Sequence, residues 1–405
     1  MTKANNASKI NAPIAVLRSP ARSRLRTWCL ALIVGSLAAC GVLTPPTEPA
    51  ATSALPARTE ASTPPSARAE GPLPPPILQA KSRWVAANWS QLPGWSQDTL
   101  AEAWVAWLLS CQRAPAAAGA VCADVRRLNG ASPMVQREWL MQGFQPYRVE
   151  TLQGGTEGLL TSYYEPVLEA SRLPRPGFSV PLYAPPAGLS QRKPWFTREE
   201  METQPQARAA LKGKELVYLA DPVDAMVLHI QGSGRIRVTE ADGRVQSVRL
   251  AFAGTNEQAY KSIGSWLLEQ GLTRDATWPG IKAWIAKNPQ RVNELLWKNP
   301  RVVFFKEESL VGAAAESGPK GAQGVPLTAG RSIAVDPGSI PYGTPVWLVS
   351  GGPQVPLHKL VLAQDTGSAI VGGIRADYFA GSGPAAGDLA GRLKQPLRMW
   401  VLLPR

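Results

Sequence analysis

The sequence predicts a mainly β protein built from barrels, together with a few helices. Short apolar, strand-like segments recur from Gly158 onward, and turns that contain glycine or proline separate them. The chain has 36 glycines and 38 prolines. This combination is typical of barrels rather than of a parallel α/β sheet. A chain of 405 residues is also long enough for two or three domains with a sizeable core.

The first 39 residues have the pattern of an export signal. They carry six basic residues and no acidic residue, and an apolar run over 28–34 precedes the sequence Leu-Ala-Ala-Cys that ends at Cys40. Small residues before a cysteine are typical of a lipoprotein signal, in which Cys40 is lipidated and becomes the first residue of the mature chain. A membrane-spanning anchor is the alternative, but it needs about 20 apolar residues. The sequence therefore predicts a lipid-anchored protein of a Gram-negative outer membrane, facing the periplasm.

Residues 40–80 are expected to form a tether rather than a folded unit. Ten prolines lie between Gly41 and Ile77, interleaved with alanine, serine and threonine. Such a composition favours an extended linker without a core. Removal of the basic signal lowers the net charge of the chain from +13 to +7. A moderately basic surface suits an anionic partner, although charge runs more often form an ordinary solvated face.

Scarce histidines and cysteines limit the possible chemistry. The chain has two histidines, His229 and His358, and four cysteines, of which Cys29 and Cys40 belong to the signal. This excludes zinc-finger, His-ligated metal and haem sites, so no metal and no cofactor are expected, and carboxylates are the candidate catalysts. In an oxidising periplasm, a disulfide between Cys111 and Cys122 is favoured over two buried free thiols.

The spacing of apolar residues predicts a helix at 98–109, with Asp98 as its N-cap, and a second helix at 134–144. Further helices are expected at 256–269 and from 281 towards 297. A hairpin turn at 241–244 joins two of the strands. The expected strands are 159–164, 180–183, 215–219, 225–230, 235–239, 245–252, 302–306, 331–335, 346–349, 359–364 and 398–403.

Asp365 and Asp377 are the candidate catalytic carboxylates. Asp365 ends an apolar strand, and a glycine-rich loop separates it from Asp377, so the two carboxylates can converge in a cleft. Glycoside cleavage needs one such carboxylic acid in its protonated form. The alternative is that both aspartates cap turns. The sequence Asp-Thr-Gly-Ser from Asp365 also resembles half of an aspartic protease site, but the chain contains no second half.

Two other features favour ordinary structural roles. His229 lies in the apolar run 226–230 and is interpreted as a buried structural histidine of a strand. The glycine-containing segment 231–235 resembles a phosphate-binding loop, but no Lys-Ser/Thr follows it. Neither nucleotide nor nucleic acid is therefore an expected partner.

Several motifs together resemble the MltA-type lytic murein transglycosylases, over a region from about residue 85 to the C-terminus. They are 161–166 (TSYYEP), 221–225 (DPVDA), 230–234 (IQGSG), 260–264 (YKSIG), 299–305 (NPRVVFF), 334–337 (AVDP), 364–367 (QDTG) and 375–377 (RAD). The last third is similar to the family's "3D" region, whose three aspartates correspond to Asp336, Asp365 and Asp377. Ser368 departs from the expected glycine, and 378–380 lacks an expected tryptophan.

The resemblance implies cleavage of the β-1,4 bond between N-acetylmuramic acid and N-acetylglucosamine in peptidoglycan, leaving 1,6-anhydromuramic ends. Asp377 would be the general acid and then base, with Asp365 tuning it and Asp336 supporting the loop. The two neighbouring carboxylates would raise the pKa of Asp377. A non-catalytic peptidoglycan-binding lipoprotein and an aspartic protease are the alternative functions.

The implied fold is a double-psi β-barrel of residues 81–165 and 300–405 with a second β domain inserted at 166–299. A groove between them would hold the glycan strand, and a cell-wall synthesis or hydrolysis complex is a possible partner. The candidate groove residues, for which barrel packing is the alternative, are Tyr163, Tyr164, Glu165, Gln231 and Ser233.

Overall fold

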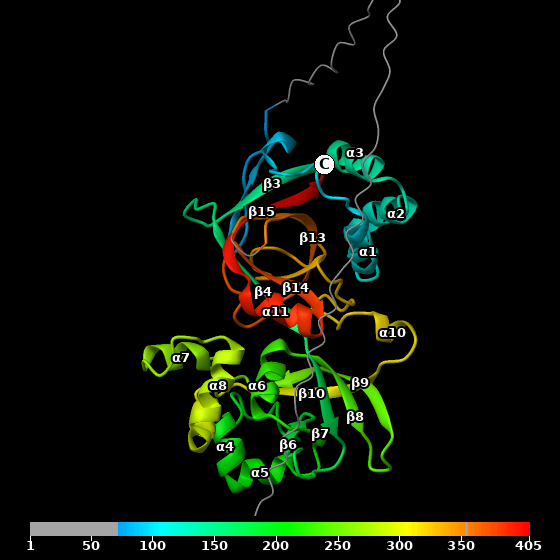
Figure 1. Ribbon diagram of the computed structural model, residues 1–405. Coiled ribbons are helices and arrows are strands. Elements are labelled where there is room, and N and C mark those ends of the chain that lie inside the picture. The colour runs from blue at the N-terminus through cyan, green and yellow to red at the C-terminus, as the bar shows by residue number, and fades with distance from the viewer. Residues whose placement is uncertain (1–71, 353–354) are drawn as a thin grey trace, which may run out of the picture. The chain divides into compact units, whose positions relative to one another are not determined.

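The computed structural model describes residues 72–352 and 355–405, whose strands form two sheets (Figure 1). The predicted signal, the lipidation site Cys40 and most of the tether lie outside the described residues. Among the helices of the described ranges, none combines the length and the hydropathy that a bilayer span needs.

The first sheet has nine strands in the order β1-β2-β3-β15-β12-β13-β11-β14-β4. Because β15 also pairs with β4, six of these strands (β4, β14, β11, β13, β12 and β15) form a closed ring of neighbours. The strands are β1 Ile77–Leu78, β2 Arg83–Ala86, β3 Phe144–Glu150, β4 Gly158–Glu165, β11 Ser332–Val335, β12 Pro345–Ser350, β13 Leu357–Asp365, β14 Arg375–Ser382 and β15 Lys394–Pro404.

Alternating residues of these strands fill the core of the ring. Ile333 and Val335 of β11 and Ala376 and Tyr378 of β14 belong to one buried apolar cluster. Because successive side chains of a strand point to opposite faces, Ala334 and Asp377 lie on the other face of the ring. The expected barrel is therefore present as a ring of strands, and Asp377 lies on the face away from this apolar cluster.

The second sheet has six strands in the order β10-β9-β8-β5-β7-β6. It continues past residue 299, the predicted end of the inserted domain, because β10 pairs with β9. Its strands are β5 Val167–Ser171, β6 Val180–Tyr183, β7 Glu215–Leu219, β8 Gly234–Thr239, β9 Val245–Thr255 and β10 Val303–Ser309. Its helices are α4 Arg198–Thr203, α5 Pro205–Leu211, α6 Pro222–Gln231, α7 Ile263–Glu269, α8 Trp278–Lys287 and α9 Val292–Trp297.

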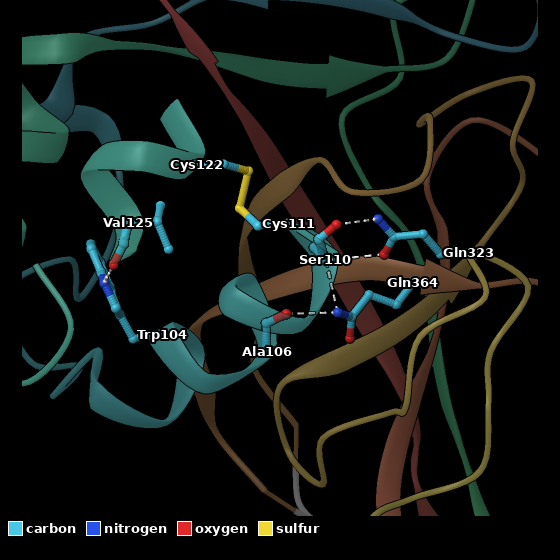
Figure 2. The surroundings of a disulfide bond; sticks show 8 residues. All are labelled: Trp104, Ala106, Ser110, Cys111, Cys122, Val125, Gln323 and Gln364. Carbon is cyan, nitrogen blue, oxygen red and sulfur yellow. Dashed lines mark hydrogen bonds between the residues drawn. A yellow bond between two sulfur atoms is a disulfide. The ribbon is translucent and has the colours of Figure 1, made fainter. Parts of the chain in front are cut away.

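Three helices, α1 Ala101–Ser110, α2 Gly119–Arg127 and α3 Pro133–Gly143, share a second apolar cluster with strands of the first sheet. Cys111 and Cys122 form a disulfide between the end of α1 and α2 (Figure 2). The two remaining α-helices are α10 Ala313–Glu316 and α11 Pro384–Arg392, and short 3₁₀ turns lie at Trp89–Gln91, Ala116–Ala118 and Pro289–Arg291.

The structure corrects several predicted elements. Asp98 does not cap α1, whose N-cap is Leu100, because its carboxylate instead forms a buried ion pair with Arg331 at 2.7 Å. The predicted strand 225–230 is part of helix α6, which Asp221 caps through a hydrogen bond to the Val223 amide. The predicted helix 256–269 begins only at Ile263.

His229 is buried, as expected, but it lies on α6 rather than on a strand. Its Nδ1 lies 2.9 Å from Nη2 of Arg198, and its ring stacks on Phe305. Burial holds the pKa of His229 well below its ordinary value, and the Arg198 charge lowers it further. Its role is therefore one of packing and hydrogen bonding.

Candidate active site

Asp365 and Asp377 flank the same residue of the ring. Ala334 of β11 stands opposite Asp365 of β13 on one side and opposite Asp377 of β14 on the other. Neighbouring strands lie about 4.8 Å apart, so the two aspartate Cα atoms are separated by about 10 Å. The side chain between them is only the methyl group of Ala334, which leaves room for the two carboxylates to approach.

A β-bulge aims Asp365 at this face. The register between β11 and β13 skips Gln364, so that Ile333 pairs with Ala363 and Ala334 with Asp365. Without the bulge, Gln364 would stand opposite Ala334 and Asp365 would point to the other face of the sheet. The bulge therefore brings the two predicted carboxylates together.

Asp377 is held from β4, which runs beside β14 (Figure 1). Thr161 stands opposite Asp377, and its hydroxyl donates a short hydrogen bond to Oδ1 of Asp377. The same hydroxyl accepts a hydrogen bond of 2.7 Å from Nη2 of Arg375. Burial raises the pKa of Asp377, and the charge of Asp365 adds to this, whereas the Thr161 hydrogen bond and the Arg375 charge lower it. The net effect favours the protonated acid.

Asp365 is held by two donors. The Tyr163 hydroxyl donates to Oδ2 at 2.8 Å, and the Ala322 amide donates to Oδ1 at 2.9 Å. Burial raises the pKa of Asp365, whereas these hydrogen bonds and one from the Thr366 amide lower it. Burial also raises the pKa of Tyr163 well above its ordinary value, so its hydroxyl stays protonated and can donate.

Asp336, the third predicted aspartate, forms its hydrogen bonds with backbone amides of turns and loops. Its Oδ1 accepts a hydrogen bond from the Gly338 amide at 2.9 Å, and its Oδ2 accepts one from the Gly372 amide at 2.8 Å. The bond to Gly338 closes a local turn after β11, and the bond to Gly372 ties Asp336 to the loop between Asp365 and Arg375. The raised pKa of Asp377 comes first from burial and then from one carboxylate, Asp365, rather than from two as the sequence suggested.

Glu165 does not lie where a substrate-binding residue would. It is fully buried, and its two oxygens accept hydrogen bonds from Arg235 at 2.7 Å and from Arg249 at 2.6 Å. Ser382 also donates to it at 2.8 Å. This environment fits the alternative of barrel packing for Glu165, because its carboxylate is buried and engaged within the protein.

The other candidate groove residues are Tyr163, Tyr164, Gln231 and Ser233, and two of them are joined by a hydrogen bond. The ring of Tyr164 packs on α11, where a Cβ at Gly387 would lie 2.9 Å from it. The Tyr164 amide donates to Oε1 of Gln231 at 3.0 Å, and Ser233 is buried nearby in the chain. Tyr163 is half-buried beside Asp365.

Sequence reasoning gave no role to Thr161 or Arg375. Both belong to the quoted motifs, but no strand was predicted at 375–382, which forms β14. In a strand, Arg375 shares a face with Asp377, just as Thr161 shares one with Tyr163. The alternation of side chains was therefore the signal that identifies them.

Within the described ranges, no three His, Cys, Asp or Glu side chains cluster as metal ligands. The chemical capacity of the site is proton transfer: Asp377, whose pKa burial raises, stands beside Asp365, whose carboxylate is held by two donors. A carboxylic acid of this kind can protonate a leaving oxygen.

Comparisons with known proteins connect this geometry to one family. Residues 159–306 match the MltA specific insert domain, and residues 331–403 match the 3D domain. The membrane-bound lytic murein transglycosylase A of Vibrio cholerae is 33% identical over 285 residues, which are 65% of this chain and 73% of that protein. The lytic transglycosylase LtgG of Burkholderia pseudomallei is 44% identical, with a TM-score of 0.56 over 82% of this chain and 98% of that chain. Escherichia coli MltA with bound chitohexaose is 27% identical, with a TM-score of 0.63 over 79% of this chain and 94% of that chain.

Proposed function

The chain belongs to the MltA family of lytic murein transglycosylases, and from this premise we propose that it is a peptidoglycan lyase. It cleaves the β-1,4 bond between N-acetylmuramic acid and N-acetylglucosamine and leaves 1,6-anhydromuramic ends. The observation that carries the proposal is the paired geometry of Asp377 and Asp365 across Ala334.

A single acid is sufficient for this reaction. Asp377 donates its proton to the glycosidic oxygen while the bond from C1 to that oxygen breaks. The C6 hydroxyl of the same muramic residue then attacks C1, and its proton passes to the Asp377 carboxylate, which restores the acid. An ordinary glycosidase needs a second carboxylate, as nucleophile or as base for water, because it does not use the C6 hydroxyl of the sugar to attack C1.

Asp365 supports Asp377 in two ways. Its negative charge raises the pKa of Asp377, which favours the proton-donating form. Its fixed position beside Tyr163 and Ala322 keeps that charge in place through the reaction. A second, stationary carboxylate also favours the positive charge that develops on the sugar ring.

The catalytic barrel is proposed to be a double-psi β-barrel, with the second sheet as its inserted domain and the groove between them as the glycan site. Tyr163, Tyr164, Gln231 and Ser233 are the proposed sugar contacts. A related MltA from Escherichia coli is described with bound chitohexaose, a chain of β-1,4-linked sugars, which supports a glycan as the ligand.

Lipidation of Cys40 and the proline-rich tether are proposed to hold the enzyme at the outer membrane, within reach of the cell wall. Association with a cell-wall synthesis or hydrolysis complex is part of this proposal. Replacement of Cys40 by serine should release the protein from the membrane fraction without loss of activity on isolated sacculi. Retention of the variant in the membrane fraction would contradict the anchor.

The activity is tested by digesting purified murein sacculi and analysing the soluble muropeptides by mass spectrometry. Products with 1,6-anhydromuramic ends are expected. Reducing muramic ends would indicate a hydrolase, and binding without soluble products would indicate the non-catalytic alternative. Asp377→Asn should abolish product release while it leaves the circular dichroism spectrum unchanged.

A further inference from the structure

A network of amide and hydroxyl groups joins the end of helix α1 to Gln323 and Gln364 (Figure 2). Ser110, the last residue of α1, accepts a hydrogen bond of 2.8 Å from Nε2 of Gln364 and donates one of 3.0 Å to Oε1 of Gln323. Gln364 also donates to the Ala106 carbonyl of α1 at 2.8 Å. Ser110 and Gln364 are both almost inaccessible to solvent. One hydroxyl therefore connects two glutamines that are distant from it in sequence.

Both glutamines stand next to a group that fixes Asp365. Gln364 is the bulge residue that precedes Asp365, and its carbonyl accepts a hydrogen bond of 3.0 Å from the Gln323 amide. Ala322, the neighbour of Gln323, donates its amide to Oδ1 of Asp365. A Cβ at Gly321 would lie 2.5 Å from the Gln364 carbonyl oxygen, so this segment approaches β13 as closely as a backbone can. Movement of Gln323 would therefore move a donor of Asp365.

The disulfide lies immediately beside this network. Cys111 follows Ser110 and is bonded to Cys122 of α2 (Figure 2). Helix α2 is in turn held against α1 by a hydrogen bond of 2.9 Å from Nε1 of Trp104 to the Val125 carbonyl. The C-terminal turn of a helix frays most easily, because its last carbonyls have no partner within the helix. The covalent bond fixes that turn and with it Ser110.

We propose that Ser110, Gln323 and Gln364 are positioning residues that hold Asp365 in its catalytic geometry, and that the Cys111–Cys122 disulfide keeps Ser110 in register with them. The inference rests on the proposed function, in which Asp365 acts on the acid Asp377. It assigns to the disulfide a part in the activity of the site in addition to its part in stability.

The test compares Ser110→Ala with a matched control, Ser350→Ala. Ser350 is equally buried, donates to the Pro396 carbonyl at 2.6 Å and accepts from Nε2 of Gln395 at 2.9 Å. It pairs with Leu357, at the opposite end of β13 from Asp365. The two substitutions therefore remove the same chemistry from places that differ in their relation to the site.

The first readout does not depend on activity. Asp365 is titrated by NMR through selectively ¹³C-labelled aspartate, and Ser110→Ala should raise its pKa by about one pH unit, since a hydrogen bond to the charged form is weakened. Gln323→Ala, a milder change at a half-buried side chain, should act in the same direction. Ser350→Ala should leave the Asp365 titration unchanged. An unchanged titration in both Ser110→Ala and Gln323→Ala would overturn the proposal, whether or not the protein releases anhydro products.

The second readout is muropeptide release. We expect Ser110→Ala to lower kcat by about tenfold with KM unchanged, because the substrate contacts remain while the catalytic geometry loosens. The double variant Cys111→Ser/Cys122→Ser should lower kcat in the same way. Combining it with Ser110→Ala should add little, because both changes act through one network. Fully additive losses, or an equal loss in Ser350→Ala, would assign the effect to general stability and refute the positioning role.

Discussion

Replacement of Thr161 by valine isolates the hydroxyl that contacts the proposed acid. Valine keeps the shape of threonine and removes the hydrogen bond to Oδ1 of Asp377. A hydrogen bond to a charged group contributes about 1.5–3 kcal/mol, and one pKa unit corresponds to about 1.4 kcal/mol. Asp377 is only half-buried, so we expect its pKa to rise by about one unit, at the low end of this range. Arg375 still holds the Leu159 and Ala376 carbonyls, so its charge stays in place.

The sign follows from the form that the hydroxyl stabilises. Thr161 donates to the ionised carboxylate, so its loss favours the protonated acid. The alkaline limb of the kcat/KM profile for muropeptide release should therefore move to higher pH by about one unit. Ser162→Ala is the control, since Ser162 lies on the opposite face of β4 and donates to the Tyr378 carbonyl at 2.7 Å. An alkaline limb that stays in place, or moves to lower pH, would refute the assignment of Asp377 as the proton donor.

Three further changes test other parts of the structure. Asp377→Asn should lower kcat by at least about 100-fold. The same change should raise the unfolding free energy at neutral pH. The pKa of Asp377 in the folded state is raised above 3.8, so the wild-type protein loses stability as pH rises from the unfolded-state pKa through the folded-state pKa. The asparagine variant should lack this loss, which differential scanning calorimetry at several pH values would detect. Glu165→Ala leaves the buried Arg249 and the partly exposed Arg235 without their counter-charge and should cost about 3–5 kcal/mol in urea unfolding, and a loss below 1 kcal/mol would contradict this. Gly158→Ala places a Cβ 1.8 Å from the Ile374 carbonyl oxygen and should lower Tm measurably, whereas an unchanged Tm would show that β4 can shift freely.

Local patterns predicted most strands of the two sheets, but they did not predict β1, β2, β3, β5 or β14, and they mistook part of one helix for a strand. The strands β6 and β7 have the predicted bounds, because alternation and turn residues mark them clearly. The apolar run 225–230 was interpreted as a strand, since a short apolar run does not distinguish a strand from a buried helix. The deciding signals lay outside the run: Pro222 at the first turn of α6, and Gly232 with φ 81° after its end.

Long-range partners account for what the sequence could not predict about the site. Asp98 resembles an N-cap locally, but Arg331 competes for it from 233 residues away. Asp365 and Asp377 were identified as a pair, yet their common face depends on a bulge and on the intervening strand β11. Thr161 contacts Asp377 across 216 residues. Such contacts depend on tertiary register, which no window of the sequence contains.

The closure of the ring by β4 and β15 also orders the events of folding. The second sheet is built from one continuous stretch, β5 to β10, so none of its strands has to wait for residues synthesised after β10. The ring closes only when β4 pairs with β14 and β15, which are synthesised after the second sheet. Pairing between strands so distant in the sequence is slow. Burial of Asp377, and with it the raised pKa, therefore requires β14 to have paired with β4. A nascent or translocating chain would have no competent acid, so an enzyme that cuts the cell wall would become active only when its barrel is complete.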